Sequence, residues 1–294
     1  MSGTVKWPRF LLVTIPLSLV MLVLYGAWTS TPIVKALAVG YPARPPEEVP
    51  PLLPFLAVVS IAQLVGFCYL YLRVYPRRSL ANAVWWGIWG GFLMVLPDGQ
   101  FFVGTPNESW GNLLMGWADG MVTATLTVAL FQLIYRPADE GRAPPRIDVP
   151  RFLIWAAIGA TLIFVLDIAF HALAAPKLFT DYPAHDFPQR PAEETQALMP
   201  WLFMVYLVQL TLFCFVYLRI YSVRSMATAL RFAVWLAFWV FIPNCQFFVG
   251  LDKYSWNMLA IQLPEAIVIT VLLIAFFETT YRPKAGATVA AAAE

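Results

Sequence analysis

An internal repeat constrains this chain more than any other feature of its sequence. Residues 67–137 align with residues 213–283 at a constant offset of 146 without a gap, and 28 of the 71 pairs are identical. A looser likeness continues upstream, where the segment that begins at Pro8 matches the segment that begins at Pro150. Such a long self-match indicates two copies of one structural unit. The chain is therefore predicted to consist of two related halves.

Composition places both copies in a lipid bilayer. Hydrophobic residues make up 60% of the chain and charged residues 12%, and the mean hydropathy is +0.70. These values are typical of polytopic membrane proteins and exclude a large aqueous domain. Apolar spans of about 20 residues cross a bilayer as helices, because lipid offers no partner to an unpaired backbone group. Eight spans are predicted, at residues 10–28, 52–74, 80–97, 112–134, 151–171, 200–221, 226–243 and 258–280.

The first span also has the character of a signal peptide. Lys6 and Arg9 precede its apolar run, and Ala36-Leu37-Ala38 resembles a cleavage site. The repeat argues against cleavage, since the segment from Phe10 aligns with a segment from Phe152 in the middle of the chain. We therefore predict that the first span is a retained helix.

The repeat also predicts the arrangement of the halves. Residues 1–137 form the first four-helix repeat, 138–149 a polar linker, 150–284 the second repeat and 285–294 a disordered tail. Four spans are an even number, so both copies enter the membrane from the same side and are related by a pseudo-twofold axis along the membrane normal. Of the 19 Lys and Arg residues, about fourteen fall on the side of the termini, which predicts that both termini are cytoplasmic.

Carboxylates inside the spans are the first candidates for a functional site, because a charge in hydrocarbon is costly. Asp119 in the fourth span corresponds to Glu265 in the eighth, so both halves hold a carboxylate at the same position. Two interpretations stay open. The pair binds a ligand or protons, or the two groups form structural hydrogen bonds between helices.

Further polar residues are predicted to lie in the outer half of the membrane. Asp167 and His171 are four residues apart and share a helical face, and their counterparts Tyr25 and Thr29 show that this pair belongs to one half only. Together the polar groups predict an acidic vestibule near the pseudo-twofold axis. Its remaining members are the residues Asp98, Gln100 and Gln246 near the outer surface and the mid-helix amides Gln63 and Gln209.

Two prolines predict where helices end, and two glycines predict a close helix contact. Pro97 and Pro243, each followed by a Gln-Phe-Phe-Val-Gly segment or its close match, are predicted to end their helices at an interfacial turn. Gly87 and Gly91 form a small-residue face that favours close contact with another helix.

Each repeat resembles small four-helix bacterial membrane domains of unknown function. The likeness depends on the order of the spans and on the segment from Phe101 to Leu114, which corresponds to Phe247 to Ala260. The resemblance implies a bacterial inner-membrane location and a single repeat that elsewhere forms a homodimer. It implies no activity.

Three functions follow from these observations. The first is a small-molecule or cation transporter or binding protein, proton-coupled through Asp119 and Glu265. The second is a non-transporting accessory or assembly subunit that packs against a membrane-protein partner or binds lipid. The third, an intramembrane enzyme that uses Asp167 and His171, lacks an activated nucleophile.

Several chemistries find no support in the sequence. No cofactor is predicted, and no basic run indicates a nucleic-acid partner. The metal question stays open. The residue types of Asp119, Glu265, Asp167 and His171 suit a divalent ion, but the sequence does not show whether they meet.

Overall fold

A computed structural model of the protein describes residues 5–37, 43–105, 108–140, 145, 147–174, 190–221 and 224–281. The regular secondary structure of this part of the chain is helical, apart from one isolated β-bridge between Ala43 and Leu251. Within the described residues, eight helical spans are long and apolar enough to cross a membrane, which confirms the predicted all-α multi-pass class. The long helices are α1 (Trp7–Thr29), α3 (Leu53–Val74), α4 (Leu80–Gly104), α5 (Trp110–Tyr135), α6 (Val149–Ala169), α9 (Met199–Ile220), α10 (Met226–Gly250) and α11 (Trp256–Thr280).

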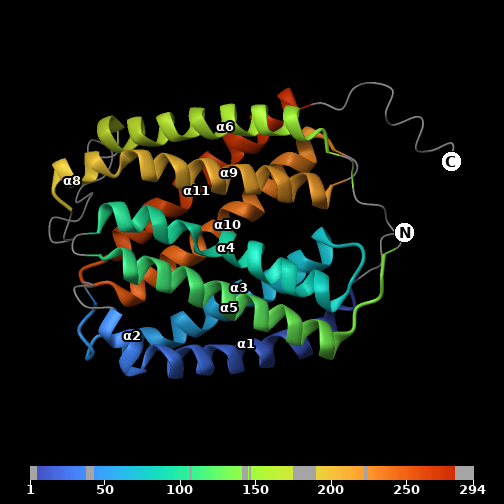
Figure 1. The fold of residues 1–294 in the computed structure, drawn as a ribbon, viewed down its shortest axis with the longest axis horizontal. Helices are drawn as coiled ribbons and strands as arrows, with labels where there is room; N and C mark the ends of the chain where they lie inside the picture. Colours follow the sequence, from blue (N-terminus) through green and yellow to red (C-terminus); the bar gives the residue numbers. More distant parts are fainter. Residues whose placement is uncertain are drawn as a thin grey trace.

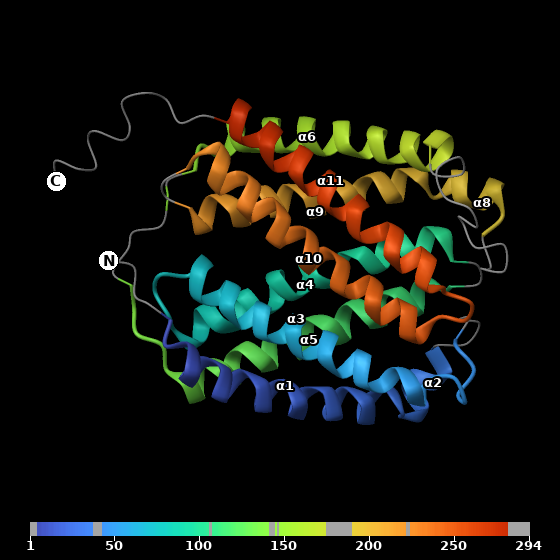
Figure 2. The ribbon, with the colours of Figure 1, turned by 180° about the vertical axis from the view of Figure 1, so that it is seen from behind.

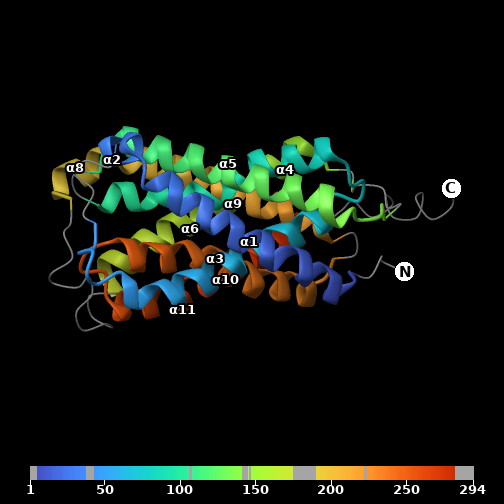
Figure 3. The same cartoon turned by 90° about the horizontal axis from the view of Figure 1, so that it is seen from below.

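The long helices run side by side along the longest axis of the molecule (Figure 3). α1 begins and α11 ends at the same end of the bundle, and the short helices α2 (Pro32–Leu37) and α8 (Ala192–Ala197) lie at the opposite end (Figures 1 and 2). The chain therefore runs along the bundle an even number of times between the start of α1 and the end of α11. The tail at 285–294 and much of the linker at 138–149 lie outside the described residues.

Serine residues at repeated positions start four of the long helices. The Ser79 and Ser225 side chains accept hydrogen bonds from the backbone of α4 and α10, and those of Ser109 and Ser255 do the same for α5 and α11. Each bond satisfies an N–H group that has no partner within its own helix. The repeat thus fixes the beginnings of equivalent helices by the same chemistry.

Packing joins the two halves closely. Within the halves, α1 packs on α3 and α5, and α6 packs on α9 and α11. Across the halves, α3 lies along α10 and α9 lies along α4. Aromatic rings fill the contact. Phe67 of α3 stacks on Trp86 of α4, with ring centroids 4.9 Å apart, and on Trp239 of α10 at 6.2 Å. The centre of the protein is therefore an apolar core shared by both halves.

The prediction that Pro97 and Pro243 end their helices is wrong. α4 continues through Pro97 to Gly104, and α10 continues through Pro243 to Gly250. A membrane helix tolerates an internal proline where neighbouring groups satisfy the freed backbone. Asp98 and Gln100 consequently lie inside α4, and Gln246 lies inside α10, instead of at a surface turn.

Two arginine residues hold the ends of these extended helices, and each comes from the other half of the chain. Arg44 donates to the carbonyl oxygens of Phe248 and Tyr254, at 2.8 and 2.9 Å. Arg190 donates to the carbonyl oxygens of Phe102 and Thr105, both at 3.0 Å. We call these two sets of contacts the arginine latches.

The arginine latches are alike in detail. The Arg44 guanidinium lies 5.5 Å from the centre of the Phe248 ring, and that of Arg190 lies 5.1 Å from the centre of the Phe102 ring. Arg44 and Phe248 are offset by 146 from Arg190 and Phe102 in opposite directions. Each half therefore secures the other half's helix end by equivalent residues.

The sequence carries a signal for the latches in the loops outside its apolar spans. The segment Pro42 to Glu48 has the pattern Pro-x-Arg-Pro-x-Glu-Glu, and the segment Pro188 to Glu194 repeats it at the same offset of 146. Such a pattern in a loop indicates a specific contact, because loops that serve only as connections vary freely.

The loop residue Glu108 next to the Arg190 latch predicts a pH dependence of stability. Burial raises its pKa from 4.5 to about 7, although a hydrogen bond from Asn112 and the nearby Arg190 charge oppose that shift. Burial therefore favours the protonated carboxyl in the folded protein. The resulting contribution to stability is complete below the unfolded-state pKa of 4.5 and is lost as the pH rises through about 7.

The measurement is the melting temperature of wild type and of Glu108→Gln in detergent between about pH 5 and pH 8. Wild type should lose stability relative to Glu108→Gln as the pH rises. Parallel curves for the two proteins would show that Glu108 ionises as freely in the folded state as in water.

Candidate functional site

Three ionisable side chains meet where the C-terminal end of α6 lies against α11. His171 Nε2 lies 2.5 Å from Glu265 Oε1 and 3.8 Å from Asp167 Oδ1. Asp167 is on α6, His171 is on the turn that follows it, and Glu265 is on α11. The side chains of Asp167 and Glu265 are 4% and 14% exposed, and that of His171 is 34% exposed. We call these three residues the acidic cluster.

The turn that carries His171 departs from the regular helix. Residues Phe170–Ala174 form a π-helical turn directly after the end of α6. A π turn widens the helix by one residue, and such turns occur frequently at functional sites. The sequence prediction of an Asp167–His171 pair on one face is consistent with the 3.8 Å separation, but Glu265 makes the closer contact with His171.

Asp167 is the most buried member of the acidic cluster. The Tyr206 hydroxyl on α9 donates a hydrogen bond to Asp167 Oδ2. Asp167 Oδ1, which faces His171, is buried and has no hydrogen-bond partner. A buried carboxylate oxygen without a donor is costly. The cluster is thus arranged to accept a further positive or proton-donating group at this oxygen.

A cavity of about 240 Å³ adjoins the acidic cluster between α6 and α11. Asp167 and Glu265 provide its polar wall, and aliphatic and aromatic side chains provide the rest. Leu166 and Val268, which also line it, are 54% and 56% exposed on the apolar surface of the bundle. The cavity therefore opens toward the hydrocarbon of a surrounding bilayer.

The two carboxylates that the repeat equates do not come together. Asp119 is on α5, which packs against α1, α3 and α4, whereas Glu265 is on α11, which packs against α6, α9 and α10. Asp119 instead lies one turn along α5 from Gly116, where a Cβ atom would be 3.6 Å from Asp98 Oδ2. The carboxylates of the predicted vestibule therefore lie in two separate groups, one in each half.

The four glutamines lie at the contact between the halves and pair with one another. Gln100 donates to Gln209 at 2.6 Å, and Gln246 donates to Gln63 at 2.7 Å. Between them, the rings of Phe101 and Phe247 stack with centroids 3.9 Å apart. Both glutamine pairs cross from one half to the other at equivalent positions.

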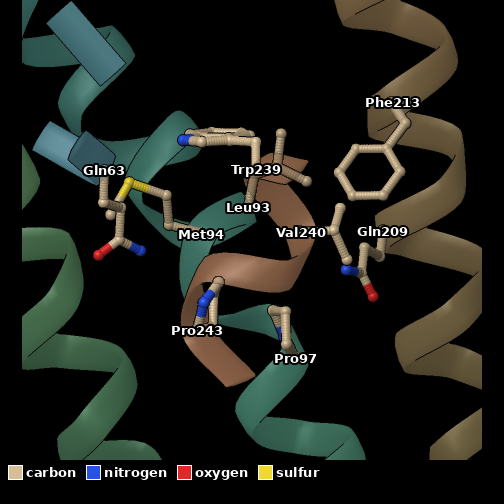
Figure 4. A pocket seen from close by; sticks show the side chains of 9 residues that line it. All are labelled: Gln63, Leu93, Met94, Pro97, Gln209, Phe213, Trp239, Val240 and Pro243. Carbon is tan, nitrogen blue, oxygen red and sulfur yellow. The ribbon is translucent and has the colours of Figure 1, made fainter. Parts of the chain in front are cut away.

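A small void separates the glutamine pairs. Figure 4 shows Gln63 and Gln209 on opposite sides of it, with Pro97 and Pro243 between them. Its volume of about 10 Å³ is at the lower limit for one water molecule. The glutamines therefore join the halves around a closed centre, and this part of the molecule offers no room for a larger ligand.

Tyr206 is the member of the site that sequence reasoning missed. It occupies the position of Ser60 in the first repeat. It lies in an apolar span, where tyrosine is a common packing residue and does not indicate a site. A difference between the copies was the available signal. The second half has Tyr206, Asp167 and His171 where the first has Ser60, Tyr25 and Thr29, so a carboxylate and an imidazole replace two hydroxyl groups.

Comparison with known proteins adds no assignment. No protein-family model, curated protein or solved structure matches the chain. The chemistry of the acidic cluster therefore has to be argued from its own residues. Two carboxylates and one imidazole, with an open apolar cavity beside them, can bind a small positively charged species and keep bulk water away from it.

Proposed function

We propose that this protein is a membrane-embedded binding protein for a small cation, which it holds at the acidic cluster. The observation that carries the proposal is the convergence of Asp167, His171 and Glu265 beside a cavity of about 240 Å³. Ionisable side chains within membrane spans are costly and mark binding sites or ion pathways. The buried Asp167 oxygen without a partner supplies the attraction for positive charge.

The proposed architecture is a pair of four-helix repeats around a pseudo-twofold axis along the membrane normal. Its support is reciprocal contact between residues 146 apart. The two arginine latches, the two glutamine pairs and the Phe101–Phe247 stack each join one half to the equivalent place in the other. The same contacts support the expected likeness of each repeat to a four-helix domain that forms homodimers.

The proposed location is a bacterial inner membrane, with both termini in the cytoplasm. The bundle end at which α1 begins and α11 ends also carries Arg9, Arg78, Arg151 and Arg224, which bond to backbone or carboxylate oxygens there. Cytoplasmic ends of membrane helices are enriched in Lys and Arg. This orientation places the acidic cluster in the outer half of the membrane.

The test is the thermal stability of the purified protein in detergent with a panel of inorganic and organic cations. Asp119→Asn is the matched control for Glu265→Gln, since the repeat equates the two positions but the acidic cluster contains only Glu265. At least one cation should raise the melting temperature of wild type and of Asp119→Asn by several degrees, and it should leave Glu265→Gln unchanged, because only that variant loses a cluster carboxylate.

A cation response that survives Glu265→Gln combined with Asp167→Asn would contradict the proposal. The comparison depends on the ligand-induced shift and not on the melting temperature itself. A general loss of stability in a variant therefore does not imitate the expected result.

A second candidate is a non-transporting accessory protein that binds lipid at the same cavity. The apolar wall of the cavity, with Leu166 and Val268 exposed on the surface of the bundle, favours it. The central void holds at most one water molecule, which argues against transport through the middle of the bundle. Lipid analysis of the purified protein distinguishes the two. A phospholipid that co-purifies with wild type and is lost on Leu166→Trp, with no cation response, would favour the accessory function.

A further inference from the structure

We infer that the acidic cluster is a binding site for a divalent first-row transition-metal ion. The inference depends on the proposed function, because it names the class of cation that the cluster holds. Asp167, His171 and Glu265 each offer one ligand atom, and these atoms all lie within 4.8 Å of one another. A metal ion would bridge α6 and α11 at the open side of the bundle.

The spacing of the three atoms suits a metal ion. His171 Nε2 is 2.5 Å from Glu265 and 3.8 Å from Asp167. Ligand atoms about 2.1 Å from a tetrahedral ion lie roughly 3.3 Å apart, a value between these two separations. A small rotation of the His171 ring, which is partly exposed and carried by a π turn, would bring both distances toward that value.

A second observation points to a ligand independently of the spacing. Asp167 is 5% exposed and its Oδ1 atom has no hydrogen-bond donor, although Tyr206 fixes the other oxygen of the same carboxylate. Metal-binding carboxylates are commonly held in this way, with one oxygen bonded to the protein and the other free for the ion. Bound metal would satisfy the buried oxygen.

The ligand set selects the type of ion. Imidazole nitrogen favours Zn²⁺, Cu²⁺, Fe²⁺ and Ni²⁺, whereas Mg²⁺ and Ca²⁺ prefer sites made of oxygen alone. Three protein ligands leave at least one coordination position open. The adjoining cavity, with Phe170 and Pro264 in its wall, provides space at that position for water or for a small ligand.

The first repeat supplies an internal comparison. It retains a carboxylate at Asp119, but Tyr25 and Thr29 stand where the second half has Asp167 and His171. The equivalent place therefore offers fewer metal-binding groups. The metal ion is therefore expected in the second half alone, so a substitution of Asp119 should leave metal binding unchanged.

The experiment measures metal bound to the full-length protein in detergent after removal of any polyhistidine tag. Wild type is loaded with Zn²⁺ or Ni²⁺, dialysed and analysed for metal, and Mg²⁺ and Ca²⁺ serve as controls. We expect about one tightly held transition-metal ion per chain. Asp167→Asn, His171→Ala and Glu265→Gln should each weaken binding by about tenfold or more, and Asp119→Asn should bind like wild type.

Two further measurements keep the result interpretable. Tyr206→Phe preserves the ring and removes the hydroxyl, so it should lower the affinity for the metal by about tenfold without unfolding the protein. Co²⁺ bound to wild type should give a visible absorption band that changes in His171→Ala. A structural loss of binding would not alter the band of the ion that remains bound.

The outcomes separate this inference from the proposed function. Wild-type binding of Zn²⁺ no stronger than that of the triple variant at Asp167, His171 and Glu265 would overturn the metal site. If an organic amine then stabilised wild type but not Glu265→Gln, the proposed cation binding would stand without a metal. If neither ion nor amine acted through the cluster, both would fail.

Discussion

Replacement of Arg190 by alanine is expected to destabilise the protein by about 3 kcal/mol or more. The guanidinium donates to three backbone carbonyls at and beyond the end of α4, those of Phe102, Thr105 and Glu108. Without it, these three carbonyl oxygens lose a charged hydrogen-bond donor in a part of the protein that is shielded from water. Hydrogen bonds to charged groups contribute more than neutral ones, and a buried acceptor left without a donor costs the full desolvation penalty.

The measurement is the melting temperature in detergent, with Glu194→Gln as control. Glu194 forms an ion pair with Arg190 at 3.2 Å, but its side chain is 58% exposed, so its loss should cost less than about 1 kcal/mol. Arg190→Lys should restore only part of the stability, because one ammonium group cannot reproduce the planar fork of arginine.

The second latch provides an independent test of the same idea. Arg44→Ala should lower the melting temperature by a similar amount, and Glu48→Gln should have as little effect as Glu194→Gln, since Glu48 is 52% exposed. Equal melting temperatures for the arginine and glutamate variants would mean that the latches contribute nothing beyond surface charge.

The change of Gly87 to alanine is expected to be nearly as damaging, at about 3 kcal/mol, although it adds only one methyl group. A Cβ atom at Gly87 would overlap the Thr125 Cα atom on α5 and lie 2.7 Å from the Thr125 hydroxyl oxygen. The obstacle includes backbone, which cannot rotate away. α4 and α5 would have to separate, and the packing between Gly91 and Ala124 would loosen with them.

The controls for Gly87→Ala come from the same chain. Gly26→Ala introduces the same methyl group where no atom lies within 4 Å, so the melting temperature should stay the same or rise. The second repeat already has Ala233 at the equivalent position, and Ala233→Gly, which removes a buried methyl group from a helix, should cost about 2 kcal/mol. A Gly87→Ala protein as stable as Gly26→Ala would show that the helices separate at no cost.

The span prediction succeeded because it depends on local composition alone. The apolar length of each segment and the small-residue face at Gly87 and Gly91 are properties of neighbouring residues. The predicted helix stop at Pro97 failed because a proline inside a helix removes only one backbone hydrogen bond, and the helix can continue beyond it. The end that α4 does adopt involves a distant partner, since Arg190 donates to the Phe102 carbonyl from 88 residues along the chain.

The candidate site was predictable in its residues and not in its grouping. Asp167, His171 and Glu265 each stand out as ionisable groups in apolar spans, and the repeat paired Glu265 with Asp119. The structure pairs Glu265 with His171, which lies 94 residues away and has no counterpart in the first half. Alignment of the two copies shows which positions are equivalent. The contacts in this site are made by residues that differ between the copies, so the alignment does not reveal them.

The exchange of latches has a consequence for the synthesis of the protein. When the ribosome has completed α4, the arginine that will hold its C-terminal end has not been made, since Arg190 follows Thr105 by 85 residues. That end of α4 therefore stays unsecured until the segment that carries Arg190 has been synthesised. Final assembly cannot proceed half by half. A ribosome that stops before residue 190 leaves a product with neither latch, because the Phe248 and Tyr254 carbonyls that Arg44 binds also come later in the chain.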